Sequence, residues 1–349
     1  MIDLIDFHVT LFFNVMACIL TAGLLILSRQ LRSREIGVRL FVCLCICNIA
    51  ESVISILVYA SLELPDSIYV ESFLLFYTLE EIVSLCHVFV WLMYVDYLLY
   101  RSADHLKRRW VAFAIPVAIL ILLVILRGIL FFVPSISDLF FEFINTAAGE
   151  VVTILEIVYM VVSVVFIYRY RKNTGRLVLF RISPFIIPIV IGLLISTFTD
   201  YSVRALGYSI GLINLYFSMI DIWKYEDSEH KCYNRAYMEK IREYAGDKKK
   251  DYGGALVFEV GGDIVPLMGI IDKELPKEVE VLKFGNDRLV AFLEGVNHNL
   301  LDSVSFMIED DVGEYEDENA GEPIDMRINR VIRKKDESAL AFVDRVVGT

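Results

Sequence analysis

The chain has 349 residues, 56% of them hydrophobic, and a formal net charge of −12. This composition is too apolar for an ordinary soluble globular protein. The charge is uneven, because residues 224–349 carry 18 Lys and Arg against 28 Asp and Glu, whereas the preceding part carries 15 against 17. The acidic C-terminal region argues against nucleic acid or anionic lipid as its partner.

Long apolar runs dominate the first two thirds of the chain. A membrane-spanning helix needs about 20 mostly apolar residues. The N-terminus carries Asp3 and Asp6 instead of a basic region, so the first run is expected to be a retained span and not a cleaved signal peptide. Seven spans are predicted, at residues 4–28, 38–62, 69–99, 110–133, 147–168, 182–199 and 203–223.

Basic residues predict the orientation of these spans. The connections after the first, third and fifth spans are basic, whereas the alternate connections hold only Arg127 and Arg204. By the positive-inside rule, the N-terminus faces out and the chain is a multi-pass protein of the inner (plasma) membrane with a cytoplasmic C-terminal domain. The basic residues are Arg29, Arg32, Arg34, Arg39, Arg101, Lys107, Arg108, Arg109, Arg169, Arg171, Lys172, Arg176 and Arg181. The aromatic outward segment 131–148 is expected to lie as a short helix on the bilayer surface.

Ionisable residues inside the predicted spans are costly to bury unless they are paired. In the third span, Glu80, Ser84, His87 and Trp91 recur on one helical face. The functional interpretation is a polar pocket, or a proton-sensitive pair in which His87 titrates against Glu51 or Glu80. The alternative is that these groups satisfy one another and simply fix the bundle. The candidate polar cluster consists of Glu51, Glu80, Glu81, His87 and Glu156.

Several other kinds of site are not expected. Five of the six cysteines lie in apolar runs, so no disulfide framework is predicted. His230 and His298 lack metal-ligand spacing to other His or Cys residues.

Pro184 and Pro188 predict a kink in the sixth span. The spans show no matching Gly/Pro interruptions in two halves, which disfavours a transporter.

Residues 224–349 predict a small α+β domain. Asn234 is placed as the N-cap of its first helix. Pro266, Gly269 and Pro276 are expected to break any long helix between 263 and 278. A hairpin is predicted around residues 285–287, because Gly and Asn tolerate positive φ. The predicted elements are helix 234–244, strand 255–260, strands 280–284 and 288–293, helix 299–313, strand 324–332 and helix 339–347.

Residues 225–349 resemble the GGDEF domain of bacterial diguanylate cyclases, which make cyclic di-GMP from two GTP molecules. The opening signature of that family, Asp-x-Leu-Thr-x-Leu-x-Asn-Arg, is matched at its polar positions by Asp227, Asn234 and Arg235. The signature hairpin, Arg-x-Gly-Gly-Asp-Glu-Phe, is matched in order by Lys283, Phe284, Gly285, Asn286, Asp287, Arg288 and Leu289.

The departures from this pattern imply a catalytically inactive domain. The family's phosphoryl chemistry needs acids that hold divalent metal, and its first-strand Asp-x-Asp is represented by Glu259 and Gly261. Arg288 replaces the second acid of the hairpin and brings a positive charge to a site for a dication. Asn286 adds a side chain where backbone should approach phosphate. The stretch 263–278 is expected to be too broken for the family's guanine-binding helices.

The favoured interpretation is a membrane-embedded signalling or regulatory protein and not an enzyme. Residues 1–223 are predicted to form a seven-helix sensor region, and residues 224–349 a degenerate GGDEF-like output domain. No cofactor, metal, GTP, cyclic di-GMP or nucleic acid is expected to bind. The expected partners are the lipid bilayer, an unidentified cytoplasmic protein and a second copy, since active members of the family work as dimers. The alternatives are an active diguanylate cyclase, or a small-solute transporter in which Glu51, Glu80 and His87 line a cavity.

Overall fold

A computed structural model divides the chain into a unit of long helices and a unit built on a β-sheet. The helical unit comprises Met1–Tyr170 and Arg181–Ser218, and the sheet unit comprises Arg171–Phe180 and Met219–Thr349. The structure describes residues 4–29, 36–100, 103–131, 138–174, 183–199, 202–225, 227, 232–247, 250–262, 264–275, 279–285, 287–295, 298–318 and 324–348.

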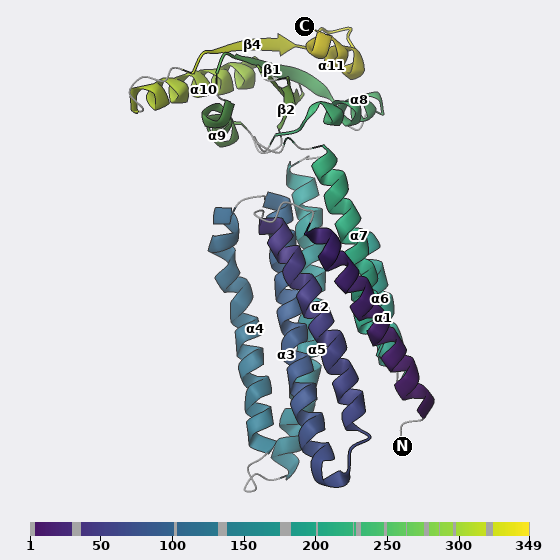
Figure 1. The fold of residues 1–349 in the computed structure, drawn as a ribbon. Helices are drawn as coiled ribbons and strands as arrows, with labels where there is room; N and C mark the ends of the chain where they lie inside the picture. The colour runs from purple at the N-terminus through teal and green to yellow at the C-terminus, as the bar shows by residue number, and fades with distance from the viewer. Residues whose placement is uncertain are drawn as a thin grey trace. The chain divides into compact units, whose positions relative to one another are not determined.

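Long α-helices build the helical unit and run along a common direction (Figure 1). They are α1 (Leu4–Ser28), α2 (Ile36–Ser61), α3 (Asp66–Tyr100), α4 (Ala103–Phe131), α5 (Asp138–Thr174), α6 (Ser183–Phe198) and α7 (Arg204–Lys224). All but α4 and α5 begin and end close to the predicted spans. Those two begin earlier than predicted, because hydropathy locates the apolar centre of a helix and not its polar first turns.

The start of α5 corrects one prediction. The segment 131–148 was expected to lie as a separate short helix on the bilayer surface. In the described part of that segment, the chain is helical from Asp138 and continues without a break into α5. Residues 132–137 of the segment lie outside the described residues.

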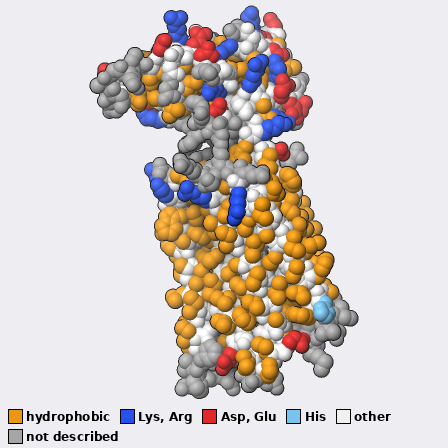
Figure 2. All heavy atoms as spheres, in the orientation of Figure 1, with side chains coloured by type: hydrophobic (Ala, Val, Ile, Leu, Met, Phe, Trp, Pro, Cys, Tyr) orange, Lys and Arg blue, Asp and Glu red, His pale blue; other side chains and the backbone are white. Residues whose placement is uncertain are grey.

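Among the residues that the structure describes, five helices are long and apolar enough to cross a membrane. Their apolar spans are Phe7–Ser28, Ile36–Ser61, Ile68–Tyr100, His105–Leu130 and Val151–Arg169. Hydrophobic side chains cover the visible face of the helical unit, and the charged ones on that face lie near its ends (Figure 2). A segment that crosses a membrane must present apolar side chains to lipid and satisfy its backbone hydrogen bonds internally, and an apolar α-helix meets both requirements. The chain is therefore a multi-pass membrane protein.

Helices α6 and α7 approach each other closely through glycines. A Cβ atom added at Gly207 would lie 2.6 Å from the carbonyl oxygen of Pro188, and one added at Gly211 would lie 2.9 Å from that of Phe185. Small residues four apart on one face are a common way for membrane helices to pack. Pro188 lacks an N–H for the carbonyl of Pro184, and the side-chain Nδ2 of Asn214 donates to that oxygen at 2.8 Å.

The sheet unit contains a four-stranded antiparallel sheet in the order β2-β3-β1-β4. The helices and strands follow one another as β-α-β-β-α-β, a ferredoxin-like arrangement, preceded and followed by a helix. The elements are η1 (Arg235–Tyr237), α8 (Met238–Gly246), β1 (Tyr252–Val260), α9 (Ile264–Glu274), β2 (Glu280–Phe284), β3 (Arg288–Glu294), α10 (His298–Glu318), β4 (Met326–Ile332) and α11 (Ala339–Gly348).

Both faces of this sheet are covered by helices. Leu256 and Phe258 of β1 pack into a core with α9 and α10, whereas Ala255 and Val257 pack into a second core with α8 and α11. Successive residues of a strand point to opposite faces. The strand is therefore apolar almost throughout, because each face buries its own set of side chains.

Helix α9 corrects another prediction. The stretch 263–278 was expected to be broken, yet Ile264–Glu274 forms an eleven-residue helix. Pro266 lies in the first turn, where a backbone N–H has no intrahelical partner to lose. Gly269 costs about 1 kcal/mol in a helix, which the buried side chains of Leu267 and Ile271 offset.

Candidate functional site: a buried charge cluster in the helical unit

Arg204, the first residue of α7, reaches carboxylates from three other helices. Its Nε lies 2.6 Å from Oε1 of Glu51 on α2. Its Nη1 lies 3.5 Å from Oε1 of Glu156 on α5, and its Nη2 lies 3.9 Å from Oε1 of Glu80 on α3. The Glu51 side chain is 2% exposed and that of Glu156 is 6% exposed. A guanidinium with five donors in a planar fork suits such a shared position.

His87 extends the cluster along α3. Its Nδ1 lies 3.2 Å from Oε2 of Glu51, and its ring packs against Tyr208 of α7 with the centroids 4.2 Å apart. One turn away, the Ser84 hydroxyl donates to Oε1 of Glu156. Among the described residues, Nε2 of His87 is buried and has no hydrogen-bond partner.

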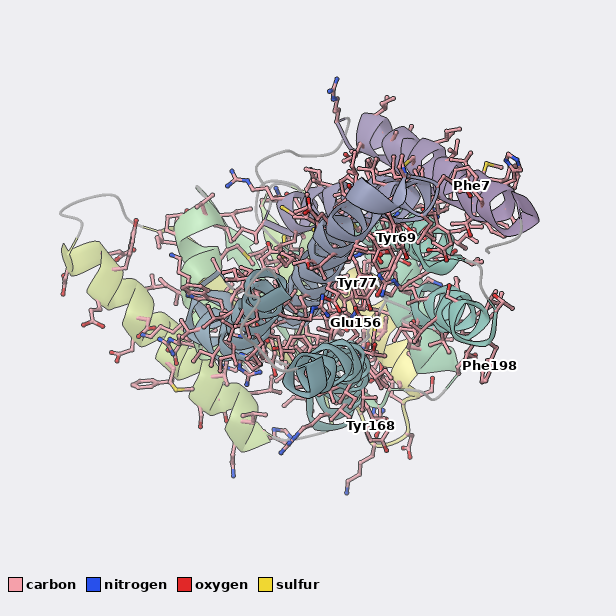
Figure 3. The ribbon with its side chains drawn as sticks, turned by 90° about the horizontal axis from the view of Figure 1, so that it is seen from below. Phe7, Tyr69, Tyr77, Glu156, Tyr168 and Phe198 are labelled. Carbon is pink, nitrogen blue, oxygen red and sulfur yellow. The ribbon has the colours of Figure 1, made fainter. Side chains whose placement is uncertain are left out.

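A second ion pair lies between α3 and α4. The Arg127 guanidinium donates to both carboxylate oxygens of Glu81, and Arg127 is fully buried. Its guanidinium carbon lies 5.3 Å from the ring centroid of Tyr77, a cation–π contact. Figure 3 labels Tyr77 and Glu156 within the bundle and Phe198 at its periphery.

Neutral polar side chains hold α7 against α1 and α2 next to this cluster. Nδ2 of Asn48 donates to Oγ1 of Thr21 at 2.8 Å and to Oγ of Ser209 at 2.9 Å. Nδ2 of Asn14 donates to the Ser202 carbonyl at 3.3 Å, just before α7 begins. Such interhelical hydrogen bonds contribute about 0.6 kcal/mol each on average in a membrane. Together they fix the helix that carries Arg204.

The sequence-predicted cluster residues fall into two groups in the structure. Glu51, Glu80, His87 and Glu156 surround Arg204, whereas Glu81 faces Arg127. The two arginines were predicted to lie in outward connections, and this was wrong. Arg127 lies inside α4 and Arg204 begins α7, because carboxylates inside the bundle offset the cost of burying a guanidinium.

The cluster can hold and exchange protons. Carboxyl, imidazole and phenol groups lie within reach of one another and of a guanidinium, which keeps its charge at any physiological pH. Within the part of the chain that the structure describes, three or more His, Cys, Asp or Glu side chains nowhere gather in a way that fits a metal ion.

In the sheet unit, a hairpin joins β2 to β3 at the residues that were matched to the family signature. Gly285 has a φ of +72°, as a tight turn requires. The Asp287 carbonyl accepts from the Val260 N–H at 2.7 Å.

Arg288 lies opposite Glu259 in the register of β3 and β1, and its Nη2 donates to the Val346 carbonyl at 2.8 Å. That carbonyl lies in the last turn of α11, where a cation is favourable. Asn286 lies outside the described residues, and Leu289 is buried in the core.

The space at Gly261 is already filled. A Cβ atom added there would overlap Oδ2 of Asp325, and the Gly261 N–H donates to the Asp325 carbonyl at 2.7 Å. On the neighbouring strand, Nδ2 of Asn329 lies 3.5 Å from Oε1 of Glu259. An acidic side chain at position 261 therefore needs Asp325 to move.

The opening segment of the sheet unit, residues 225–237, is hydrogen-bonded to the edge strand β2 through Tyr233. Asn234 accepts from the Ala236 N–H at 2.9 Å as the predicted N-cap, and its Nδ2 donates to the Lys224 carbonyl at 2.9 Å. Asp227 lies 3.5 Å from Nζ of Lys283. The exposed Arg235 begins the 3₁₀ helix.

A buried polar network next to this segment escaped the sequence reasoning. Glu280 accepts from the Tyr237 hydroxyl at 3.1 Å and the Tyr252 hydroxyl at 3.3 Å, and Nζ of Lys250 lies 3.4 Å from it. Burial and the neighbouring Glu280 carboxylate raise the pKa of Tyr237 and of Tyr252, so both phenols remain donors. The one available signal was a carboxylate at the start of an apolar strand.

Fold and site together define a multi-pass helical membrane protein with a small antiparallel-sheet domain and a buried charge cluster within its helical unit. No protein-family model matches the chain, and no curated protein matches it.

Proposed function

We propose that this chain is a membrane-embedded signalling protein whose helical unit controls a non-catalytic, GGDEF-like output domain. In this proposal the bundle has seven spans, the N-terminus faces out, and residues 224–349 lie in the cytoplasm. The domain signals by binding another protein and does not make cyclic di-GMP.

The connections between helices support the orientation. By sequence, residues 62–65, 132–137 and 199–203 contain no Lys or Arg. The two basic residues that were assigned to this side belong to helices. The connections on the other side are residues 29–35, 101–102 and 175–182, and by sequence they contain Arg29, Arg32, Arg34, Arg101, Arg176 and Arg181. The other basic residues predicted for that side belong to helices. This difference between the two sides is what the positive-inside rule requires of cytoplasmic loops.

The observation that carries the proposal is that the single helix α7 begins in the helical unit and ends in the sheet unit. Arg204, at its start, belongs to the helical unit, whereas Lys224, at its end, belongs to the sheet unit. Asn234 binds the Lys224 carbonyl from the side chain, and its N–H donates to the Tyr225 carbonyl at 2.8 Å. A change in the ion pairs of Arg204 therefore acts on a helix whose other end is hydrogen-bonded to the output domain. A stimulus is effective only if it binds the two states of that helix unequally.

Two features support a non-catalytic output domain. The guanidinium of Arg288 donates to the Val346 carbonyl at the end of α11, so the residue that the resemblance matches to a metal-binding acid has a structural contact of its own. Asp325 fills the space that a second first-strand acid at position 261 needs. A site for GTP and two divalent cations would have to displace both.

Helix α10 offers a surface for a partner. Phe306 is 65% exposed, and Asp310, Glu314 and Asp317 follow it on the same helical face. Residues 298–318 contain no Lys or Arg. An exposed aromatic side chain surrounded by acids fits a basic partner segment with an apolar anchor, since charge complementarity selects partners and Phe is enriched at interfaces.

The enzymatic part of the proposal is tested with the full chain in lipid nanodiscs, incubated with GTP and Mg²⁺ or Mn²⁺. We expect no cyclic di-GMP above a protein-free blank, because Gly261 and Arg288 replace two of the acids in the family pattern. Synthesis of cyclic di-GMP that an Asp287→Ala change abolishes would contradict the proposal and favour a diguanylate cyclase.

The output surface is tested with a photo-crosslinking residue at position 306 in the native host. We expect an adduct with a basic protein, and loss of that adduct when Asp310 and Glu314 are both changed to Lys. A crosslinker at Lys335, an exposed residue away from α10, is the control. Equal adducts from both positions, or none from position 306, would contradict the proposed surface.

A further inference from the structure

The buried charge cluster contains more acids than cations. If every carboxyl is ionised and His87 is neutral, the cluster carries two more negative than positive charges. An unpaired carboxylate buried within membrane-spanning helices destabilises the fold by several kcal/mol. The acids are Glu51, Glu80, Glu81 and Glu156, and the cations are Arg127 and Arg204.

Glu80 has the weakest cationic support of the four acids. Glu51 lies 2.6 Å from Arg204 and also contacts His87, and Glu81 is bound at both oxygens by Arg127. Glu156 lies 3.5 Å from Arg204 and also accepts from Ser84. The only ion pair of Glu80 among the described residues is the 3.9 Å contact with Arg204.

His87 is poorly placed to supply the missing positive charge. In its neutral form Nδ1–H donates to Glu51, and the buried Nε2 lacks a partner. A proton added at Nε2 would be a buried donor with no acceptor, which costs about 1–3 kcal/mol. The proton that lowers the net charge at least cost therefore belongs on a carboxyl.

We infer that Glu80 is a proton-binding site and is a carboxylic acid at neutral pH. The groups facing it are Arg204 of α7, Glu51 and Ser55 of α2, and Glu81 of its own helix. When the pH rises, the proton leaves to water and the new carboxylate attracts Arg204. If the proposed function also holds, this release is the stimulus that α7 transmits, so the bundle responds to alkaline conditions.

The proton is detected directly by infrared spectroscopy of the full chain in lipid nanodiscs. We expect a carbonyl band of a protonated carboxylic acid at neutral pH that disappears in Glu80→Gln and fades in the wild type as the pH is raised. Glu71→Gln, at an exposed position of α3, is the matched control and keeps the band. If the wild type and Glu80→Gln give the same carboxylic-acid bands, Glu80 is ionised and the inference is wrong.

Thermal unfolding gives a second readout. Gln imitates a protonated Glu, so Glu80→Gln should leave the Tm within about 2 °C of the wild type at neutral pH, whereas Glu51→Gln should lower it clearly. A fall in Glu80→Gln as large as that in Glu51→Gln, or its failure to fold, would contradict the inference. Both readouts concern the helical unit alone, so a proton at Glu80 with an unresponsive sheet unit would refute the proposed coupling and not the proton site.

Discussion

Removal of the Arg204 guanidinium leaves Glu51 and Glu156 buried without their shared cation. We expect Arg204→Gln to destabilise the helical unit by about 3 kcal/mol, because breaking a buried pair strands an uncompensated charge. The measurement is the Tm of the full chain in detergent. Arg169→Gln, at an exposed position of α5, is the matched control and should stay within about 0.5 kcal/mol of the wild type. Equal Tm values for the two variants would contradict this role of Arg204.

In the sheet unit, Glu337 offers a pH-dependent contact. Its hydrogen bonds from Arg345 and the Lys334 N–H lower its pKa from 4.5 to about 2. A carboxyl whose pKa falls on folding stabilises the folded state above its unfolded pKa and loses that contribution as the pH falls through the folded pKa. Glu337→Gln should therefore lower the Tm at pH of about 7, with the deficit shrinking as the pH falls below about 4. Asp336→Asn, next to it, is the matched control for loss of an exposed carboxylate.

Single residues of the site were only partly predictable. Glu51, Glu80, Glu81, His87 and Glu156 stand out because each is ionisable within an apolar run. Their partners depend on how the helices are rotated in the bundle, which the sequence pattern leaves open. Arg127 and Arg204 were misassigned because a basic residue near the end of a span resembles a loop residue. The excess of carboxylates inside the spans was the signal that cations must lie among them.

At the scale of elements, α6 and α7 depend on a substitute hydrogen bond. Asn214→Ala should cost about 1 kcal/mol, because the Pro184 carbonyl then loses its only side-chain donor among the described residues. Adding Pro188→Ala restores a backbone N–H for that carbonyl, so the double variant should regain most of the lost Tm. If Pro188→Ala lowers the Tm further in the Asn214→Ala background, this account of the helix pair is wrong.

Most helices and strands could be predicted from periodicity and turn residues. The hairpin of β2 and β3, the helix α11 and the N-cap at Asn234 agree with the sequence pattern. Helix α9 could not be predicted in this way, because Pro266 and Gly269 count as breakers unless the start of the helix is known. The helices on both faces of the sheet could not be predicted from the strand sequences either. A strand that is buried on both faces lacks the alternation of apolar and polar residues that shows which face is buried.

For the whole molecule, the helix α7 carries a residue of the charge cluster at its start and continues into the sheet unit at its end. The cluster residues are distributed over α2, α3, α4, α5 and α7, so none of these five helices can shift alone without changing an ion pair. Of these helices, α7 leads directly into the opening segment of the sheet unit. The GGDEF-like character of that unit stays a prediction, and the coupling through α7 does not depend on it.

Hydrogen–deuterium exchange of the full chain in lipid nanodiscs tests this coupling most directly. Arg204→Lys keeps the charge but removes the fork that reaches three carboxylates. We expect it to change exchange at the amides of Tyr233 and Asn234, which donate to the Val281 and Tyr225 carbonyls, while Arg169→Lys leaves them unchanged. Altered exchange in the helical unit with identical exchange in residues 232–247 would contradict the claim that α7 carries the state of the cluster to the sheet unit.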